Sequence, residues 1–262
     1  MKLDYYVLDP TGNMTILVET PAAAASQPFC ASALLAAEPT AEQVGFLSPG
    51  GDGYDLALRM AGGEFCGNAT MSAAAVYCQR TGCTGRVRVR VSGAPAPVAV
   101  EIGVSPEGGY TGAVEMPRCA GMETVSLAAE GRSFRLPLVR YDGISHLIVT
   151  EPVEKSFAER AVKRWCGELG ADGLGLMLLD EAAKTLTPLV YVPGADTLYW
   201  ERSCASGTAA VGAYLAETEG KAVELRLAEP GGSLGVSASP GGAVILRGGV
   251  RLLRRGALET AP

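Results

Sequence analysis

Polar and hydrophobic residues alternate in two segments that lie in different halves of the chain. Every second residue is valine in Arg86-Val87-Arg88-Val89-Arg90-Val91, and Val223-Glu224-Leu225-Arg226-Leu227 alternates in the same way. A period of two residues is typical of a β-strand with one buried face and one solvated face. The alternation therefore predicts strands at 86–91 and 223–227.

Shorter patterns predict further elements. Hydrophobic segments at 5–8 and 15–18 flank the turn-forming sequence Asp9-Pro10-Thr11-Gly12-Asn13. This arrangement predicts a β-hairpin with Asn13 on an exposed loop. The alanine- and leucine-rich residues 29–38 predict a short helix. Additional strands are expected at 56–60, 134–139 and 247–253.

An alanine-rich segment precedes each alternating strand, and each segment starts at a cysteine and ends at a glycine. The two segments are residues 66–82 and 204–220. Alanine is the strongest helix former, and glycine commonly follows the last helical residue. We therefore predict that each cysteine lies at the start of a helix. The first helix is expected at 69–81, with Asn68 as its cap.

The two segments belong to a longer internal repeat. Glu64-Phe65-Cys66-Gly67-Asn68-Ala69-Thr70 corresponds to Arg202-Ser203-Cys204-Ala205-Ser206-Gly207-Thr208, with a constant offset of 138 residues. A chain of 262 residues can hold two domains of ordinary size. We expect two similar halves, residues 1–118 and 119–262, with the last strand returning to the first half.

The composition is that of a globular protein that acts on small molecules. Hydrophobic residues make up 48% of the chain and charged residues 19%, as in packed α/β or α+β proteins. The net charge of −6 and the lack of basic clusters argue against a nucleic-acid or membrane partner. The N-terminal segment has no long apolar region followed by a cleavage site, which favours a cytoplasmic location.

Cysteine usage does not indicate a disulfide framework or a metal site. The seven cysteines are an odd number and are widely spaced. No Cys-x-x-Cys motif occurs and His146 is the only histidine, so a zinc-ligand set is not apparent. We expect no metal and no cofactor, and most thiols to be buried as small hydrophobic groups.

Cys66 and Cys204 differ from the other cysteines because each is expected at a helix start. Backbone N–H groups at a helix N-terminus lower the pKa of a thiol and also bind anions such as a carboxylate. A thiolate on one side of an amino acid can remove the Cα proton while a thiol on the other side returns one. The bound carboxylate takes up the charge of the carbanion. The pattern therefore indicates inversion at Cα by two cysteines.

The motifs around these cysteines resemble those of the diaminopimelate epimerase family. The resemblance implies an α+β fold of two pseudo-symmetric halves, each with a central helix wrapped by a curved sheet of mixed and antiparallel strands. It also implies a pyridoxal-phosphate-independent racemase or epimerase, an isomerase. The matching segments are Gly12-Asn13, Cys66-Gly67-Asn68-Ala69, Glu201-Arg202, Cys204-Ala205-Ser206-Gly207-Thr208 and Pro230-Gly231-Gly232-Ser233-Leu234.

The same resemblance assigns roles to individual residues. Cys66 and Cys204 take the two catalytic positions of the family. Backbone groups near each cysteine are implied to hold the substrate α-carboxylate. The expected substrate-binding residues are Asn13, Gly67, Asn68, Glu201, Arg202, Gly207 and Thr208.

Some segments depart from the diaminopimelate epimerases. Ile144-Ser145-His146 stands in place of Asn-Pro-His, and residues 61–65 lack the asparagine of the family. The loop from Arg202 to Cys204 is shorter, which argues against a contact between Arg202 and a distal carboxylate. These differences favour another amino acid, as in the histidine racemases, which share the compact motif before the cysteine. Diaminopimelate is the alternative substrate.

Two functions of other classes stay open on the residues alone. The cysteines would form a regulatory disulfide in a thiol-redox protein, and a non-catalytic protein would only bind amino acids. His146 is interpreted as a packing or polar residue, and Glu64 equally as a substrate contact or a solvated acid. Residues 173–175 and 230–233 lack the ending of a phosphate loop and are interpreted as turns. The expected partner is an amino-acid substrate, and a homodimer is left open.

Overall fold

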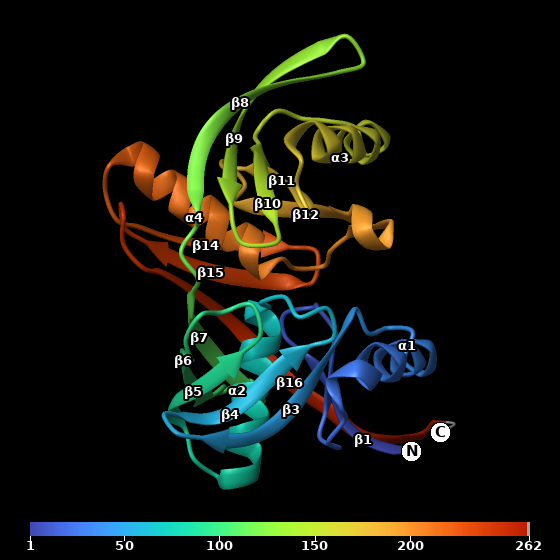
Figure 1. Ribbon diagram of the computed structural model, residues 1–262. Coiled ribbons are helices and arrows are strands. Elements are labelled where there is room, and N and C mark those ends of the chain that lie inside the picture. Colours follow the sequence, from blue (N-terminus) through green and yellow to red (C-terminus); the bar gives the residue numbers. More distant parts are fainter. Residues whose placement is uncertain (261–262) are drawn as a thin grey trace. The chain divides into compact units, whose positions relative to one another are not determined.

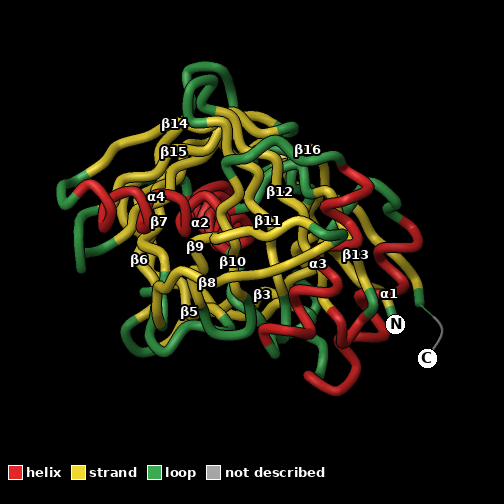
Figure 2. The backbone as a smooth tube through the Cα atoms, turned by 90° about the horizontal axis from the view of Figure 1, so that it is seen from above, coloured by secondary structure: helices red, strands yellow, loops and turns green. Residues whose placement is uncertain are grey.

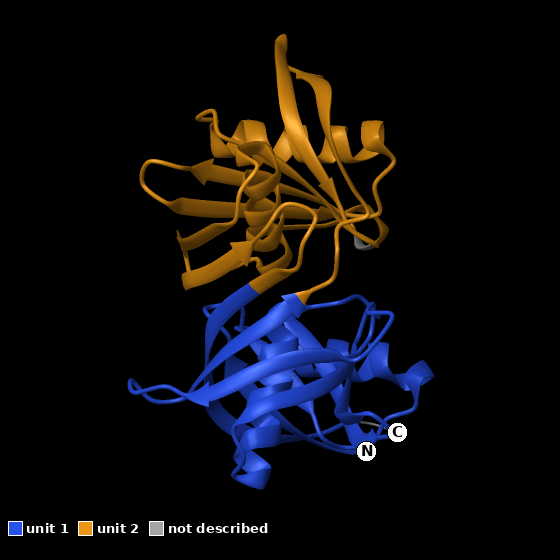
Figure 3. Ribbon diagram, turned by 90° about the vertical axis from the view of Figure 1, so that its left-hand side faces the viewer, with its two compact units in different colours: residues 1–115, 246–262 blue, residues 116–245 orange. Residues whose placement is uncertain are grey.

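The computed structural model describes residues 1–260. Contacts within the chain divide it into two compact units, which Figure 3 shows in different colours. Unit 1 comprises Met1–Glu115 and Leu246–Pro262, and unit 2 comprises Met116–Ile245. Whether the chain folds as independent domains divided at residue 118 stays a prediction. Within residues 1–260, no helix is long and apolar enough to span a membrane.

The strands of unit 1 form a closed path. β1 pairs with both β2 and β16, and the path continues from β2 through β3, β4, β5, β6 and β7 back to β16. Figure 1 shows these strands around α2. Unit 1 contains β1 (Lys2–Asp9), β2 (Thr15–Val18), the short 3-10 helix η1 (Ala24–Ser26), α1 (Gln27–Ala37), β3 (Gln43–Gly51), β4 (Tyr54–Met60), α2 (Gly67–Thr81), β5 (Gly85–Val91), β6 (Val98–Val104), β7 (Tyr110–Met116) and most of β16 (Val244–Glu259).

Unit 2 has the same kinds of element around a second buried helix. Its strands follow one another in the order β8, β9, β10, β11, β12, β14 and β15, and β13 additionally pairs with β12. Helix α4 packs against β14 and β15, and α3 packs against β11 and β12. The elements are β8 (Gly121–Ala129), β9 (Arg132–Arg140), β10 (Ser145–Val149), α3 (Lys155–Leu169), β11 (Leu174–Asp180), β12 (Thr185–Val192), η2 (Pro193–Ala195), β13 (Thr197–Trp200), α4 (Ala205–Glu219), β14 (Val223–Glu229) and β15 (Gly232–Ala238).

The strand pairings repeat in the same sequence in both units. In unit 1, antiparallel β1–β2 is followed by parallel β2–β3, antiparallel β3–β4, parallel β4–β5 and antiparallel β5–β6. In unit 2, β9–β10, β10–β11, β11–β12, β12–β14 and β14–β15 show the same alternation. The duplication seen in the sequence is therefore also a duplication of topology, and the predicted α+β class is confirmed.

Buried alanines explain why α2 can lie at the centre of unit 1. Residues 73–75 are three consecutive alanines without exposed surface, and every residue from Gly67 to Val76 is buried. Small side chains let surrounding strands approach a helix closely from all sides. Figure 2 shows strands, in yellow, as the main regular structure around the helices.

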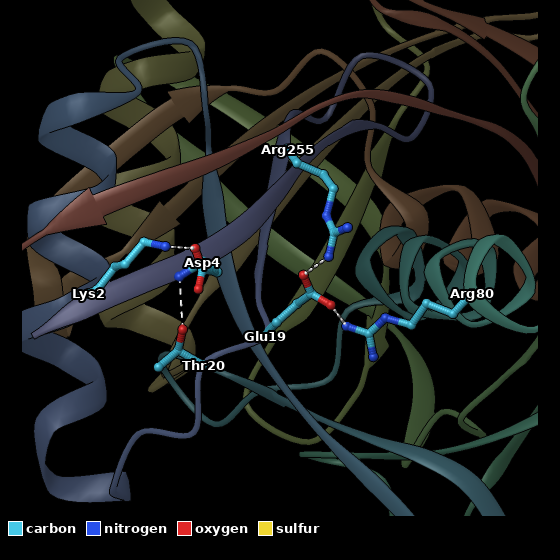
Figure 4. Close-up of polar contacts among 6 residues, drawn as sticks. All are labelled: Lys2, Asp4, Glu19, Thr20, Arg80 and Arg255. Carbon is cyan, nitrogen blue, oxygen red and sulfur yellow. Dashed lines mark hydrogen bonds and ion pairs between the residues drawn. The ribbon is translucent and has the colours of Figure 1, made fainter.

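An ion-pair cluster at Glu19 connects the C-terminal end of α2 to the surrounding strands of unit 1. Glu19, just after β2, contacts Arg80 in the last turn of α2 and Arg255 on β16 (Figure 4). Both arginines also lie over the ring of Tyr6 on β1, at 5.6 and 4.7 Å from its centroid. The cluster joins α2 to two neighbouring strands, and it lies at the helix end opposite Cys66.

Several element predictions are confirmed and two are wrong in part. The hairpin, the strand at 86–91 and the helix at 69–81 are present, and Gly82 ends α2 in the left-handed conformation with a φ of 71°. Of the predicted turn at 173–175, Leu174 and Gly175 instead begin β11, and of the predicted turn at 230–233, residues 230 and 231 form a turn while Gly232 begins β15. Gly175 pairs with His146 on β10 and is therefore part of the sheet. The His146 ring leaves no room for a side chain at position 175, which explains the glycine there.

Candidate active site

Cys66 is the N-cap of α2, and its sulfur takes part in the cap. Its backbone is extended, with φ −133° and ψ 114°, and the N–H of Ala69 donates to Sγ at 3.4 Å. Asn68 was expected to be the cap, and this prediction is wrong. Asn68 lies inside the first turn and is 2% exposed, because the chain enters the helix at Gly67.

Cys204 occupies the same position at the start of α4. It is extended, with φ −126° and ψ 104°, and the N–H of Gly207 donates to its Sγ at 3.4 Å. A Cβ atom at Gly207 would lie 2.0 Å from Sδ of Met177 and 3.2 Å from Sγ of Cys204. Glycine is therefore required where the thiol packs against the first turn.

The turn before each cysteine is anchored at equivalent places. The carbonyl of Glu64, two residues before Cys66, accepts a hydrogen bond from the hydroxyl of Ser92 at 2.8 Å. In unit 2, the carbonyl of Arg202 accepts the N–H of Gly231 at 2.7 Å. Both donors lie just after the strand that follows the helix, so helix and strand together fix the position of the thiol.

The surroundings of Cys204 raise the pKa of its thiol well above the usual value. Burial is the largest cause, followed by the nearby carboxylates of Glu201 and Glu229, while the N–H of Gly207 lowers the pKa. The sequence led us to expect a lowered pKa from the helix N-terminus. That expectation is wrong for Cys204 because one N–H contact does not offset complete burial and two acidic neighbours.

Glu229 is a buried acid that the sequence did not single out. Its Oε2 accepts the N–H of Cys204 at 2.8 Å, and Thr208 donates its hydroxyl to Oε1 at 2.6 Å. Burial raises the pKa of Glu229 to about 8, although both hydrogen bonds lower it. A signal was present, because continuing the alternation of β14 by two residues places position 229 on the buried face.

His146 is a neutral, buried neighbour of the Cys204 helix start. Its Nε2 lies 2.9 Å from Oγ of Ser206, and that oxygen is 3.7 Å from Sγ of Cys204. Complete burial lowers the pKa of His146 to about 3, so the imidazole is uncharged at neutral pH. The hydroxyl of Ser206 therefore links an uncharged imidazole to the thiol.

Asn13 lies in unit 1 and is buried, although an exposed loop was expected. It is 7% exposed; its amide donates to Oε2 of Glu42 at 2.6 Å, and its Oδ1 accepts from Gln43 at 2.5 Å. Gln43 also donates to the hydroxyl of Thr15 at 2.8 Å. The hairpin loop is covered because parallel pairing sets Thr15 opposite Gln43. No motif near Asn13 in the chain indicates that Glu42 and Gln43 are its partners.

The predicted site residues are divided between the two units. Around Cys66, Gly67 and Asn68 form the first turn of α2, and Glu64 is exposed. Around Cys204, Gly207 contacts the thiol and Thr208 contacts Glu229. The last two predicted residues precede Cys204: Glu201 is partly buried and Arg202 is exposed.

Each unit has a cysteine at the start of a buried helix, on a duplicated α+β fold, as the resemblance to racemases and epimerases implies. Residues 2–252 match the family described as "Histidine racemase CntK N-terminal domain". The chain belongs to this family of isomerases. The expected placement in the histidine racemase branch is confirmed.

Relatives of known name are similar over most of the chain. The histidine racemase of Staphylococcus aureus (strain Mu50) is 30% identical over 242 residues, which cover 88% of this chain and 87% of that one. The histidine racemase of Fusobacterium nucleatum subsp. nucleatum (strain ATCC 23726) is 30% identical over 223 residues, 81% of each chain.

Solved structures support the fold. A predicted epimerase from Pseudomonas aeruginosa superposes with a TM-score of 0.71 at 20% identity and covers 99% of this chain and 100% of its own. A hydroxyproline epimerase from Agrobacterium vitis gives a TM-score of 0.71 at 13% identity, covering 98% and 92%. At these identities the likeness concerns the fold alone.

Proposed function

We propose that this protein interconverts the two enantiomers of histidine without a cofactor, with Cys66 and Cys204 as the two bases. The observation that carries the proposal is that both cysteines are helix N-caps of the same geometry, in a chain of the histidine racemase family. The names of the relatives at 30% identity support histidine as the substrate. Diaminopimelate is the alternative to be tested.

The proposed reaction moves one proton in each direction. One cysteine, as thiolate, takes the proton from Cα; the Cα–H bond breaks, an S–H bond forms, and the electron pair delocalises into the substrate carboxylate. The second cysteine, as thiol, gives its proton to the opposite face of Cα. The enzyme then holds the thiolate on the other cysteine, ready for the reverse reaction.

The carboxylate is proposed to bind at backbone N–H groups of the two helix starts. In α2 the family resemblance assigns this contact to Gly67 and Asn68. In α4 the N–H groups of Gly207 and Thr208 already donate to Sγ and the carbonyl of Cys204. We infer that Ala205 provides a backbone donor in α4, while Gly207 and Thr208 remain predicted contacts.

The remaining substrate contacts are also proposals. Asn13 is held by two partners and is therefore preorganised to bind a polar group. Glu201 is proposed to bind the substrate ammonium or its side chain, because it is the partly buried acid before Cys204. Arg202 is exposed, and its part in binding stays a prediction, as do a cytoplasmic location and a homodimer.

The test is racemisation of a panel that contains L-histidine, other L-amino acids and meso-diaminopimelate. The purified protein is incubated with each compound, and chirality is followed by chromatography with and without added pyridoxal phosphate. We expect histidine to racemise fastest and the added cofactor to have no effect. Inversion of diaminopimelate but not of histidine would establish the alternative, and full activity in both Cys66→Ser and Cys204→Ser would refute the mechanism.

A further inference from the structure

The carboxyl of Glu229 binds both ends of the first turn of α4. It accepts the N–H of Cys204 at 2.8 Å and the hydroxyl of Thr208, four residues later, at 2.6 Å. Only 7% of Glu229 is exposed. Burying a carboxyl costs free energy unless hydrogen bonds compensate. Here both hydrogen bonds hold the helix start that presents the thiol.

Unit 1 has a hydrophobic residue at the equivalent position. The offset of 138 residues that relates the two cysteines makes Val91, buried on β5, the counterpart of Glu229 in the repeat. Thr70, the counterpart of Thr208, instead donates its hydroxyl to the carbonyl of Cys66 at 2.7 Å. The two helix starts share their backbone geometry, but position 91 does not carry the carboxyl that position 229 has.

We propose that Glu229 is a positioning residue that fixes the backbone of Cys204 and keeps this thiol protonated as the pH rises through the range in which thiols ionise. The proposal rests on the proposed function, because a two-base reaction needs one thiolate and one thiol before it starts. A negative charge beside Cys204 opposes a second one there, whereas valine at position 91 has no such effect on Cys66. Glu229 therefore adds to burial and to Glu201 in keeping Cys204 the protonated thiol as the pH rises.

The hydrogen bonds around Glu229 suit both of its protonation states. As a carboxylate it accepts from the N–H of Cys204 and from the hydroxyl of Thr208. As a carboxylic acid it donates its proton to the Thr208 oxygen, and its other oxygen still accepts from Cys204. Since burial raises the pKa of Glu229 to about 8, its charge develops where cysteine thiols begin to ionise.

Other titratable groups also face this part of unit 2. Glu201 raises the pKa of the Cys204 thiol, and Cys204 and Cys119 both contribute to the raised pKa of Tyr141. His146 is uncharged at neutral pH. All of these groups stay in place in a Glu229→Gln variant. That substitution therefore isolates the charge of Glu229 while it keeps the size of the side chain and an acceptor oxygen.

The test is the pH dependence of alkylation at each cysteine in the full-length protein without substrate. Iodoacetamide labelling at Cys66 and Cys204 is quantified by peptide mass spectrometry between about pH 6.5 and about 9.5. Wild type is compared with Glu229→Gln and with Glu224→Gln, an exposed glutamate on the same strand as the matched control. The Cys204 thiol is equally buried in all three proteins. The ratio of its labelling rate in each variant to that in wild type therefore reports how readily the thiol ionises.

We expect Glu229→Gln to label Cys204 at the wild-type rate near pH 6.5 and about tenfold faster near pH 9.5, because the carboxylate no longer opposes ionisation of the thiol. Cys66 labelling and the Glu224→Gln control should match wild type throughout. An unchanged Cys204 profile in Glu229→Gln would overturn the proposal. Equal acceleration at both cysteines would also overturn it, because it would report general opening. Labelling requires no racemisation, so this result is independent of the substrate test.

Discussion

Replacing Gly207 by alanine tests whether the packing of the first turn of α4 sets the position of the Cys204 thiol. The added Cβ would lie 2.0 Å from Sδ of Met177, 3.1 Å from its Cε and 3.2 Å from Sγ of Cys204. Met177 has no exposed surface and cannot move into solvent. The side chain or the helix start must therefore shift, and the thiol shifts with it.

The expected magnitude combines two opposing terms. Alanine in place of glycine favours a helix by up to about 1 kcal/mol, whereas overpacking a buried site costs about 1–3 kcal/mol. At a separation as short as 2.0 Å the upper part of that range applies. We expect the free energy of unfolding to fall by roughly 1–2 kcal/mol, and racemisation to fall with it as the thiol is displaced.

Gly167→Ala is the matched control. Gly167 lies in α3, and a Cβ atom there meets nothing within 4 Å. Its substitution should stabilise the protein by about 0.4–1 kcal/mol. Thermal unfolding should therefore separate the two variants by roughly 4–10 °C. If Gly207→Ala melts at or above Gly167→Ala and racemises at the wild-type rate, the packing argument is refuted.

The remaining predictions concern the neutral histidine and the ion-pair cluster. His146 has a folded pKa near 3, below its unfolded value of 6.5, so the unfolded chain binds the proton first and stability is lost as the pH falls below 6.5. Between about pH 6.5 and 5 the free energy of unfolding should fall by up to about 2 kcal/mol more in wild type than in His146→Gln; equal slopes in denaturant titrations would contradict the assigned state. Glu19→Gln should lower the free energy of unfolding by about 0.5–1 kcal/mol through loss of its contacts with Arg80 and Arg255. That loss should shrink in about 1 M salt, and a salt-independent effect would indicate that packing rather than charge is responsible.

Local signals account for the elements that the sequence predicted. The alternation at 86–91 indicates a strand with one solvent-exposed face and one buried face, and β5 has that burial pattern. Gly82 and Gly220 end α2 and α4 because both adopt the left-handed conformation, with φ 71° and 65°. Each of these features depends on residues close together in the chain. The same helix and strand pattern occurs again 138 residues later, and this was sufficient to predict a duplicated fold.

Other features depend on residues that are far apart in the sequence. β16 closes unit 1 by pairing with β1, and Lys2 lies opposite Glu259 there. Asn13 is buried only because β3 brings Gln43 beside it. The pKa of Cys204 is raised by burial, by Glu201 and by Glu229, and of these two acids Glu229 is the one distant in the sequence. The positions of the two cysteines at helix starts could therefore be predicted from the sequence. The groups that surround each thiol could be identified only from the tertiary structure.

The most direct test of the two-cysteine mechanism is the fate of the Cα proton in D2O. Protiated L-histidine is converted to a few per cent, and the recovered substrate and the D-histidine product are analysed separately by mass spectrometry. Two bases predict that the product carries deuterium at Cα while the recovered substrate keeps its protium, and that Cys66→Ser and Cys204→Ser each abolish inversion. A product that retains the original protium would show that a single base serves both faces, and would contradict the account.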